Sequence, residues 1–120
     1  MTIHQIIVGN SNNMHQIPSG SVQLIVTSPP YPMIEMWDDM FSTQNADIFD
    51  ALTHNQGTTA FMKMHEVLNK TWSECDRVLS DNGFICINIG DATRTINGDF
   101  QLYSNHTQII NFFLSRGYSV

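Results

Sequence analysis

The chain has 120 residues, the size of one domain with a small hydrophobic core. Its hydrophobic share of 42% is that of a globular rather than a disordered protein, and its net charge of −6 argues against a surface that grips a nucleic-acid backbone by itself. No apolar run is long enough to span a membrane, the N-terminal residues do not form a signal peptide, and two cysteines are too few for a disulfide framework. We therefore expect a soluble protein of the cytoplasm.

Hydrophobic runs predict three strands. The first covers residues 3–8 and the second covers residues 22–27, which end at two prolines that cannot continue a central strand. Residues 32–56 show no clean period, and we expect a loop with a short helix there. Residues 84–89 are almost continuously apolar, which is typical of a parallel strand covered on both faces.

Two helices are predicted from apolar side chains at three- and four-residue spacing. The first covers residues 59–79, and we expect it to end at Ser80 with Gly83 in a left-handed cap. The second is centred on residues 109–114, with Asn105 near its start and Gly117 at its end. The alternation of strands and helices predicts an α/β fold with a parallel sheet.

The most informative segment, residues 28–31, directly follows the second predicted strand. In open α/β sheets ligands bind at the carboxyl ends of the strands. An isolated Pro-Pro pair is more typical of a simple turn, but Ser28, Pro29, Pro30 and Tyr31 stand together after a buried strand. This context favours a functional site over a turn.

Ser28-Pro29-Pro30-Tyr31 matches in full the (Ser/Asp/Asn)-Pro-Pro-(Tyr/Phe/Trp) motif of the DNA amino-methyltransferases, and the sequence resembles that family. Residues 8–11 are similar to its Gly-Asp-(Ser/Cys) turn, with Asn10 in place of Asp. Residues 59–91 are similar to its next helix and strand. The resemblance implies a Rossmann-like methyltransferase fold with a partial parallel sheet and flanking helices.

The resemblance also implies transfer of a methyl group from S-adenosylmethionine to an exocyclic base nitrogen, with Ser28, Pro29, Pro30 and Tyr31 as catalytic residues. Such a nitrogen is a poor nucleophile, because its lone pair is delocalised into the ring. Acceptors at the Ser28 hydroxyl and the Pro29 carbonyl would draw the two N–H bonds out of the ring plane and free the lone pair. The prolines remove competing N–H donors, and Tyr31 offers a flat face to a flipped base.

The methyl donor is expected to contact Asn10, Ser11, Ser28 and Asp91. Two of these residues keep a structural alternative, since Asn10 could simply hold a turn and Asp91 could simply cap a loop. Trp37 and the two acidic residues after it could shape the pocket mouth or pack within their own loop. No histidine or cysteine spacing indicates a metal site, and His65 is expected to be an exposed helix residue.

Serine in the first motif position favours cytosine N4 as the target, since Asp is commoner in the adenine enzymes of the family. Residues 32–38 are also similar to the MvaI-type cytosine-N4 methylases. The alternatives are an adenine-N6 DNA methyltransferase, or an inactive remnant or binding subunit of a split methyltransferase. Methylation of cytosine carbon 5 is excluded, because neither Cys75 nor Cys86 follows a proline, and both are expected in the core.

Two parts of the family's pattern are missing from these residues. The chain has no Gly-x-Gly, whereas the family's donor loop reads Phe-x-Gly-x-Gly, and it has no basic target-recognition region. We expect residues 1–120 to be the catalytic, N-terminal part of a methyltransferase domain, completed by a C-terminal half or a second subunit. Its expected partner is double-stranded DNA with a flipped target base in a restriction-modification system, without a membrane or a metal.

Overall fold

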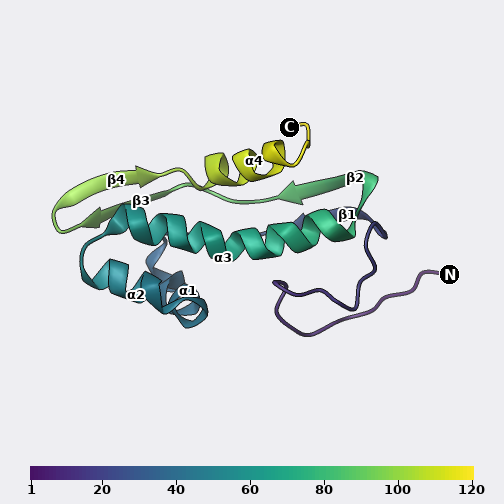
Figure 1. Cartoon of the computed structure of the whole chain (residues 1–120), viewed down its shortest axis with the longest axis horizontal. Coiled ribbons are helices and arrows are strands. Elements are labelled where there is room, and N and C mark those ends of the chain that lie inside the picture. The colour runs from purple at the N-terminus through teal and green to yellow at the C-terminus, as the bar shows by residue number, and fades with distance from the viewer.

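The long helix α3 (Gly57–Val78) forms the axis of the molecule in the computed structural model, which describes all 120 residues. The body measures 55 × 29 × 22 Å. Strands and α4 lie along one side of α3, while α1 and α2 lie along the first half of its other side (Figure 1). The remaining elements are β1 (Val22–Thr27), a 3-10 turn (Glu35–Trp37), α1 (Asp38–Gln44), α2 (Ala46–Thr53), β2 (Leu79–Ile87), β3 (Ala92–Ile96), β4 (Asp99–Tyr103) and α4 (Asn105–Ser115).

Strands β1 and β2 pair in parallel, which confirms the predicted α/β fold. The sheet is covered on one face only, contrary to the prediction for residues 84–89. Ile25 and Ile85 turn toward the hydrophobic core, whereas Leu24 and Phe84, which are paired with each other, are exposed. Cys86 lies on this exposed face, so its predicted place in the core is wrong, while Cys75 on α3 is buried as expected.

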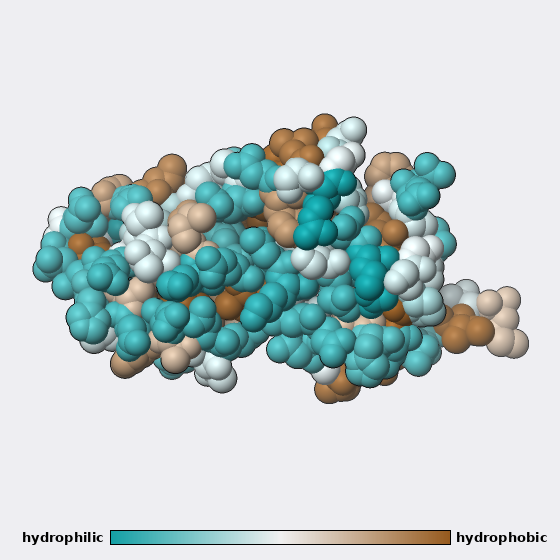
Figure 2. Space-filling view, in the orientation of Figure 1, coloured by the Kyte–Doolittle hydropathy of each residue, from teal (hydrophilic) through white to brown (hydrophobic).

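The first predicted strand does not form. Residues 3–8 belong to no sheet, and Ile3, Ile6 and Val8 are exposed. Figure 2 shows apolar atoms of the N-terminal end projecting from the body. A β-branched run favours an extended backbone, but a strand also needs a neighbouring edge with which to exchange hydrogen bonds, and no edge pairs with this segment.

Helix α3 is confirmed, but its predicted glycine cap is wrong. Leu79 is extended, with φ −71° and ψ 134°, so β2 begins directly after the helix. Gly83 does not have a positive φ. Residues 80–83 instead form an irregularity in the pairing of β1 with β2. Val22 pairs with Leu79 and Leu24 pairs with Phe84, so one residue of β1 stands opposite four residues of β2.

A β-hairpin follows β2, in a stretch where no strand was predicted from the sequence. Strands β3 and β4 pair in antiparallel around Asn97 and Gly98, whose φ angles of 51° and 80° belong to a two-residue primed turn. Residues 32–56 also hold two short helices rather than one. The features predicted for α4 are confirmed, including Gly117 at its end with a φ of 89°.

The hydrophobic core surrounds α3 and joins it to α1 and α2 as well as to the β3–β4 hairpin and α4. It contains Met33, Phe41, Ile48, Ala51, Ala60, Phe61, Met64, Val67, Leu68, Trp72, Cys75, Ala92, Tyr103, Ile109 and Phe113. None of the helices is both long enough and apolar enough to cross a bilayer.

Candidate active site

The predicted catalytic segment lies at the carboxyl edge of the parallel sheet. The amide of Asn88 donates to the carbonyl of Thr27 at 2.9 Å, so the chain leaves β1 and β2 at the same level. A Cβ atom on Gly90 would lie 3.4 Å from Cε2 of Tyr31, which means that the Tyr31 ring lies beside the Gly90 backbone. Ser28 is exposed. The turn after β2 and the Ser28–Tyr31 segment therefore form two sides of one site.

A tight turn follows this segment and anchors it in the core. The amide of Ile34 donates to the carbonyl of Tyr31 at 3.2 Å, and Met33 has a φ of 69°, which together with Pro32 is the pattern of a type II turn. Met33 is 1% exposed, and its amide donates to Sδ of Met64 at 3.4 Å. Methionine in this backbone conformation carries strain, which burial of its side chain offsets.

Asn105, the first residue of α4, connects the segment after the motif to the turn after β2. Its side-chain amide donates to the carbonyl of Pro32 at 3.0 Å and to the carbonyl of Gly90 at 3.1 Å. Its Oδ1 atom lies 2.9 Å from Nε2 of His65 on α3. The Asn105 side chain is completely buried. One amide thus links α3, α4 and both loops of the site.

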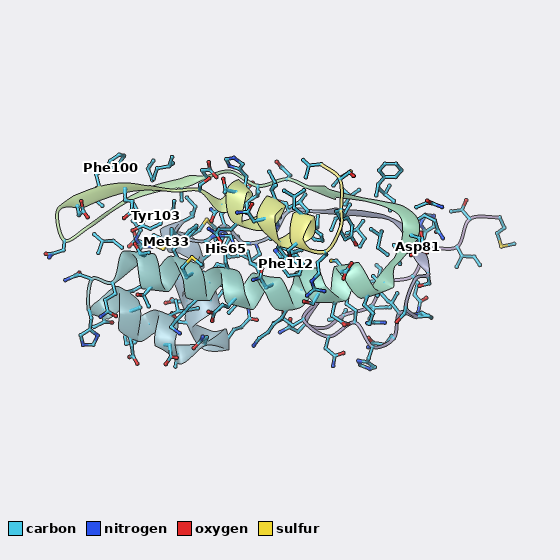
Figure 3. All side chains as sticks on the ribbon, turned by 45° about the horizontal axis from the view of Figure 1, so that its top comes forward. Met33, His65, Asp81, Phe100, Tyr103 and Phe112 are labelled. Atoms are coloured by element: carbon cyan, nitrogen blue, oxygen red, sulfur yellow. The ribbon has the colours of Figure 1, made fainter.

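His65 is buried rather than exposed, which corrects the expectation for this residue. Figure 3 places it with Met33 on the side of α3 that faces the strands and α4. Since Oδ1 of Asn105 can only accept, Nε2 of His65 carries the proton, and the buried Nδ1 has no partner. Burial lowers the pKa of His65 more than the hydrogen bond with Asn105 raises it, so the neutral ring is favoured.

The burial of His65 could have been predicted from the sequence. His65 stands four residues after Phe61 and three before Leu68, on the apolar stripe of the helix. A polar residue on such a stripe needs a buried partner. Nothing in the sequence identifies that partner as Asn105, which lies 40 residues further along the chain.

Asp91 reaches the same edge but is held by α4. The backbone N–H of His106 donates to Oδ1 of Asp91 at 3.1 Å, and Nδ1 of the His106 ring lies 2.8 Å from the same oxygen. Partial burial raises the pKa of Asp91, but the hydrogen bonds from His106 outweigh it, so the net pKa is lowered. Asp91 thus binds the first turn of α4, whereas the structural alternative predicted for it was the cap of a loop.

Asn10 and Ser11 make their hydrogen bonds with other parts of the chain. The Asn10 side chain accepts the amide of Asn12 at 2.9 Å, which is the turn-holding alternative for this residue. The hydroxyl of Ser11 lies 3.3 Å from that of Thr71 on α3. No hydrogen bond connects either residue to Ser28–Tyr31.

The segment after the motif packs within the protein. Trp37 is half-buried and contacts the hydrophobic core. Both oxygens of Asp38 accept from Arg94 of β3, at 2.9 and 2.8 Å, while Asp39 is exposed. This fork of two parallel hydrogen bonds fastens α1 to the hairpin.

The arrangement offers acceptors and a flat ring at a rigid edge. The Ser28 hydroxyl makes no hydrogen bond within the protein, and neither Pro29 nor Pro30 has a backbone N–H that would compete with the N–H donors of a ligand for the acceptors of the site. No group of three His, Cys, Asp or Glu side chains is close enough to hold a metal ion. Such an edge can bind a planar group that carries N–H donors.

Comparison with protein families shows which proteins this chain is similar to. The sequence pattern of the DNA methylase family matches residues 22–116. Type II methyltransferase M.MthZI of Methanothermobacter thermautotrophicus is 48% identical over 99% of this chain and 34% of its own length. Type II methyltransferase M.MjaI of Methanocaldococcus jannaschii is 44% identical over 98% of this chain and 42% of its own length. The chain therefore spans about two-fifths or less of these relatives.

A similar fold is found in a solved structure. The crystal structure of TTHA0409 from Thermus thermophilus, assigned as a DNA modification methylase, aligns with a TM-score of 0.63 at 23% sequence identity. The alignment covers 98% of this chain and 42% of that protein. The likeness establishes the methyltransferase fold for nearly all of the residues described above.

Proposed function

This chain belongs to the DNA methylase family, whose members use S-adenosylmethionine as methyl donor, and from this premise we propose that it forms the catalytic part of a DNA cytosine-N4 methyltransferase. The observation that carries the proposal is the position of Ser28–Tyr31. The motif stands at the carboxyl edge of the sheet, with Tyr31 against Gly90 and with Ser28 free to bind.

In the proposed mechanism, the hydroxyl of Ser28 and the carbonyl of Pro29 accept hydrogen bonds from the two N–H groups of the target amine. These two hydrogen bonds favour a tetrahedral nitrogen, whose lone pair is no longer delocalised into the ring. Pro29 and Pro30 hold both acceptors in place, because their φ angles are fixed. The ring of Tyr31 stacks on the base taken out of the duplex. S-Adenosylmethionine, when bound, would supply the methyl group on a positively charged sulfur: its carbon–sulfur bond would break as the nitrogen lone pair forms the new carbon–nitrogen bond, neutral S-adenosylhomocysteine would leave, and the surplus N–H proton would pass to water.

The residues of the site fit the donor in part. The hydroxyl of Ser28 and the carboxylate of Asp91 both lie at the sheet edge, and a carboxylate with a lowered pKa suits a cationic ligand. Asn10 and Ser11 remain predicted donor contacts, although they make their hydrogen bonds elsewhere. We propose that Ser28 and Asp91 provide this chain's share of the donor site.

Cytosine N4 is proposed as the target because the motif begins with serine and because residues 32–38 are similar to the MvaI-type methylases. Adenine N6 is the alternative target. An inactive remnant or a binding subunit is the alternative role, and the intact four-residue motif argues against it.

A larger assembly is part of the proposal. We propose that residues 1–120 are the catalytic, N-terminal part of a methyltransferase domain, and that a C-terminal half or second subunit supplies the Gly-rich donor loop and a basic DNA surface. The net charge of −6 supports this division, since DNA affinity depends on Lys and Arg. The relatives are named Type II methyltransferases, which supports a restriction-modification role on double-stranded DNA.

The complete methylase tests this function. The complete methylase is this chain joined to the rest of its own protein. If residues 1–120 are produced as a separate chain, the complete methylase is instead a chimera in which they replace the matching segment of M.MthZI. After incubation with DNA and labelled donor, digestion to nucleosides should yield N4-methylcytosine. N6-methyladenine alone would contradict the base assignment, and no methylated nucleoside would contradict the function.

Ser28→Ala in the same enzyme should lower kcat about 10²-fold, as expected for the loss of one preorganised polar group. Ser42→Ala, on α1, is the matched control, because the Ser42 hydroxyl makes no hydrogen bond. An unchanged rate for Ser28→Ala would contradict the proposed mechanism.

A further inference from the structure

We propose that Asn105 is a positioning residue for methyl transfer and that His65 orients it. The inference rests on the proposed function and deepens it, since it names the group that sets the geometry of the site. Neither residue belongs to the motif. Both are completely or almost completely buried beneath it, with exposed fractions of 0% for Asn105 and 3% for His65.

The hydrogen bonds of Asn105 determine the spacing of the site. Its amide nitrogen has two N–H groups, and one binds each loop, at Pro32 and at Gly90. Pro32 directly follows Tyr31, and Gly90 is the backbone against which the Tyr31 ring lies. The distance between the stacking ring and the opposite loop is therefore fixed through a single planar amide.

His65 determines which way this amide faces. Because Nε2–H of His65 donates to Oδ1 of Asn105, a flipped amide would place its NH2 group against this N–H donor and its single oxygen against the carbonyl oxygens of Pro32 and Gly90. The His65 ring is itself held by the edge-to-face contact with Phe61, at 4.7 Å between ring centroids. The three bonds of Asn105 thus have one arrangement in which all are satisfied.

Substituting Asn105 should affect the chemical step more than the binding of ligands. Asn105→Asp keeps the shape but places a carboxylate oxygen against two carbonyl oxygens, which should separate the loops. Asn105→Ala leaves both carbonyls without their donor. Because a displacement of about 1 Å at reacting groups can cost about 10²-fold in rate, we expect kcat to fall by about 10²-fold in either variant. The affinity for S-adenosylmethionine should change little, since Asn105 does not reach the open edge.

The experiment uses single-turnover rates and donor affinities of the complete methylase. The matched control is Asn45→Ala, which removes another side-chain hydrogen bond of an asparagine, the cap of α2, at a place that contacts neither loop. The control should lower thermal stability while leaving kcat unchanged. A fall in kcat for Asn105→Asp and Asn105→Ala with unchanged donor affinity supports the positioning role.

A second pair of variants keeps the proposal testable if the Asn105 variants do not fold. His65→Gln retains an N–H donor for Oδ1 of Asn105, and His65→Phe retains the ring shape without the donor. We expect the rate of His65→Gln to exceed that of His65→Phe. Equal rates in this pair, or Asn105 variants with the kcat of the Asn45→Ala control, would overturn the inference.

The outcomes separate this inference from the function on which it rests. An unsubstituted enzyme that methylates no base, or a Ser28→Ala variant with full activity, would overturn the proposed function and this inference with it. An active enzyme that depends on Ser28 but not on Asn105 would overturn this inference alone.

Discussion

Tyr31 is the residue at which binding of the base can be separated from folding. Its ring is half-buried beside Gly90 and belongs to no strand or helix. We expect Tyr31→Ala to remove a stacking contact worth about 1–3 kcal/mol per base, which corresponds to a loss of about 5- to 150-fold in kcat/KM. The measurement is methyl transfer to duplex DNA by the complete methylase.

Tyr31→Phe provides the control, because it keeps the flat ring and removes only the hydroxyl, for which the structure shows no hydrogen bond. It should retain most of the activity. Equal losses in Tyr31→Phe and Tyr31→Ala would show that the hydroxyl rather than the ring face acts.

At the residue scale, the sequence predicts only what is local. Ser28, Pro29, Pro30 and Tyr31 are adjacent, so a single stretch of chain carries their pattern. Asn105 contacts Pro32 across 73 positions, and the sequence alone indicates only that an asparagine stands near a helix start. Contacts between distant parts of the chain depend on how α3 and α4 pack, which local patterns do not determine.

The hairpin β3–β4 can be tested through its turn. Gly98 has a φ of 80°, and no atom lies within 4 Å of the place where a Cβ would stand. Gly98→Ala should therefore destabilise through the backbone alone, by about 1–2 kcal/mol. The measurement is the free energy of unfolding in urea, together with hydrogen exchange of the hairpin amides.

Gly9→Ala is the matched control, since the Cβ at this position is equally free of neighbours and Gly9 does not have a positive φ. Its effect on the free energy of unfolding should stay within about 0.5 kcal/mol. Equal stabilities of the two variants would argue against the primed turn.

The junction of α3 and α4 should respond to pH through His65. Burial holds the pKa of His65 below its ordinary value of 6.5. Between these two pKa values the unfolded chain binds a proton that the folded chain does not, so the free energy of unfolding should fall as pH decreases below about 6.5. Urea unfolding at pH 7.5 and 5.5 measures this loss.

Because other histidines also titrate, the test is the difference between the protein and His65→Gln, which has no ring to protonate. The variant should lose less stability between the two pH values. The same loss in both proteins would show that His65 does not govern this dependence.

At the element scale, three- and four-residue spacing predicts α3 and α4, because each helix buries one face. Apolar runs predict β1 and β2, although the run of residues 84–89 wrongly indicated a strand covered on both faces. The hairpin was missed although Asn97-Gly98 is a strong turn signal and Phe100 and Leu102 alternate with polar residues in β4. The centre of β3, Thr93-Arg94-Thr95, is polar and gives no apolar run of its own. Residues 3–8 show the reverse case. Their composition favours a strand, but pairing depends on a neighbour that composition does not reveal.

One face of the molecule is distinctly apolar. On the outer side of the β1–β2 sheet, Leu24 is 57% exposed, Val26 is 72% exposed and Phe84 is 73% exposed. These side chains adjoin one another through the pairing of the two strands. A contiguous apolar surface of this kind marks a contact with another part of a protein, because removing apolar side chains from water lowers the free energy. We expect the remaining part of the proposed methylase to cover it.

Residues 1–120 as a separate chain should therefore self-associate. Light scattering should give a mass above the 13.6 kDa of the monomer, and replacing both Val26 and Phe84 by Thr should reduce it, since Thr suits a strand but removes apolar area. Phe49→Ser is the control, because Phe49 is 61% exposed on α2, away from this face, and its loss should leave the mass unchanged.

The separate chain should also bind S-adenosylmethionine and DNA weakly or not at all in calorimetry, since it has neither a Gly-rich loop nor a basic surface. A monomer with micromolar affinity for the donor would contradict both the division of the enzyme and the proposed share of the donor site.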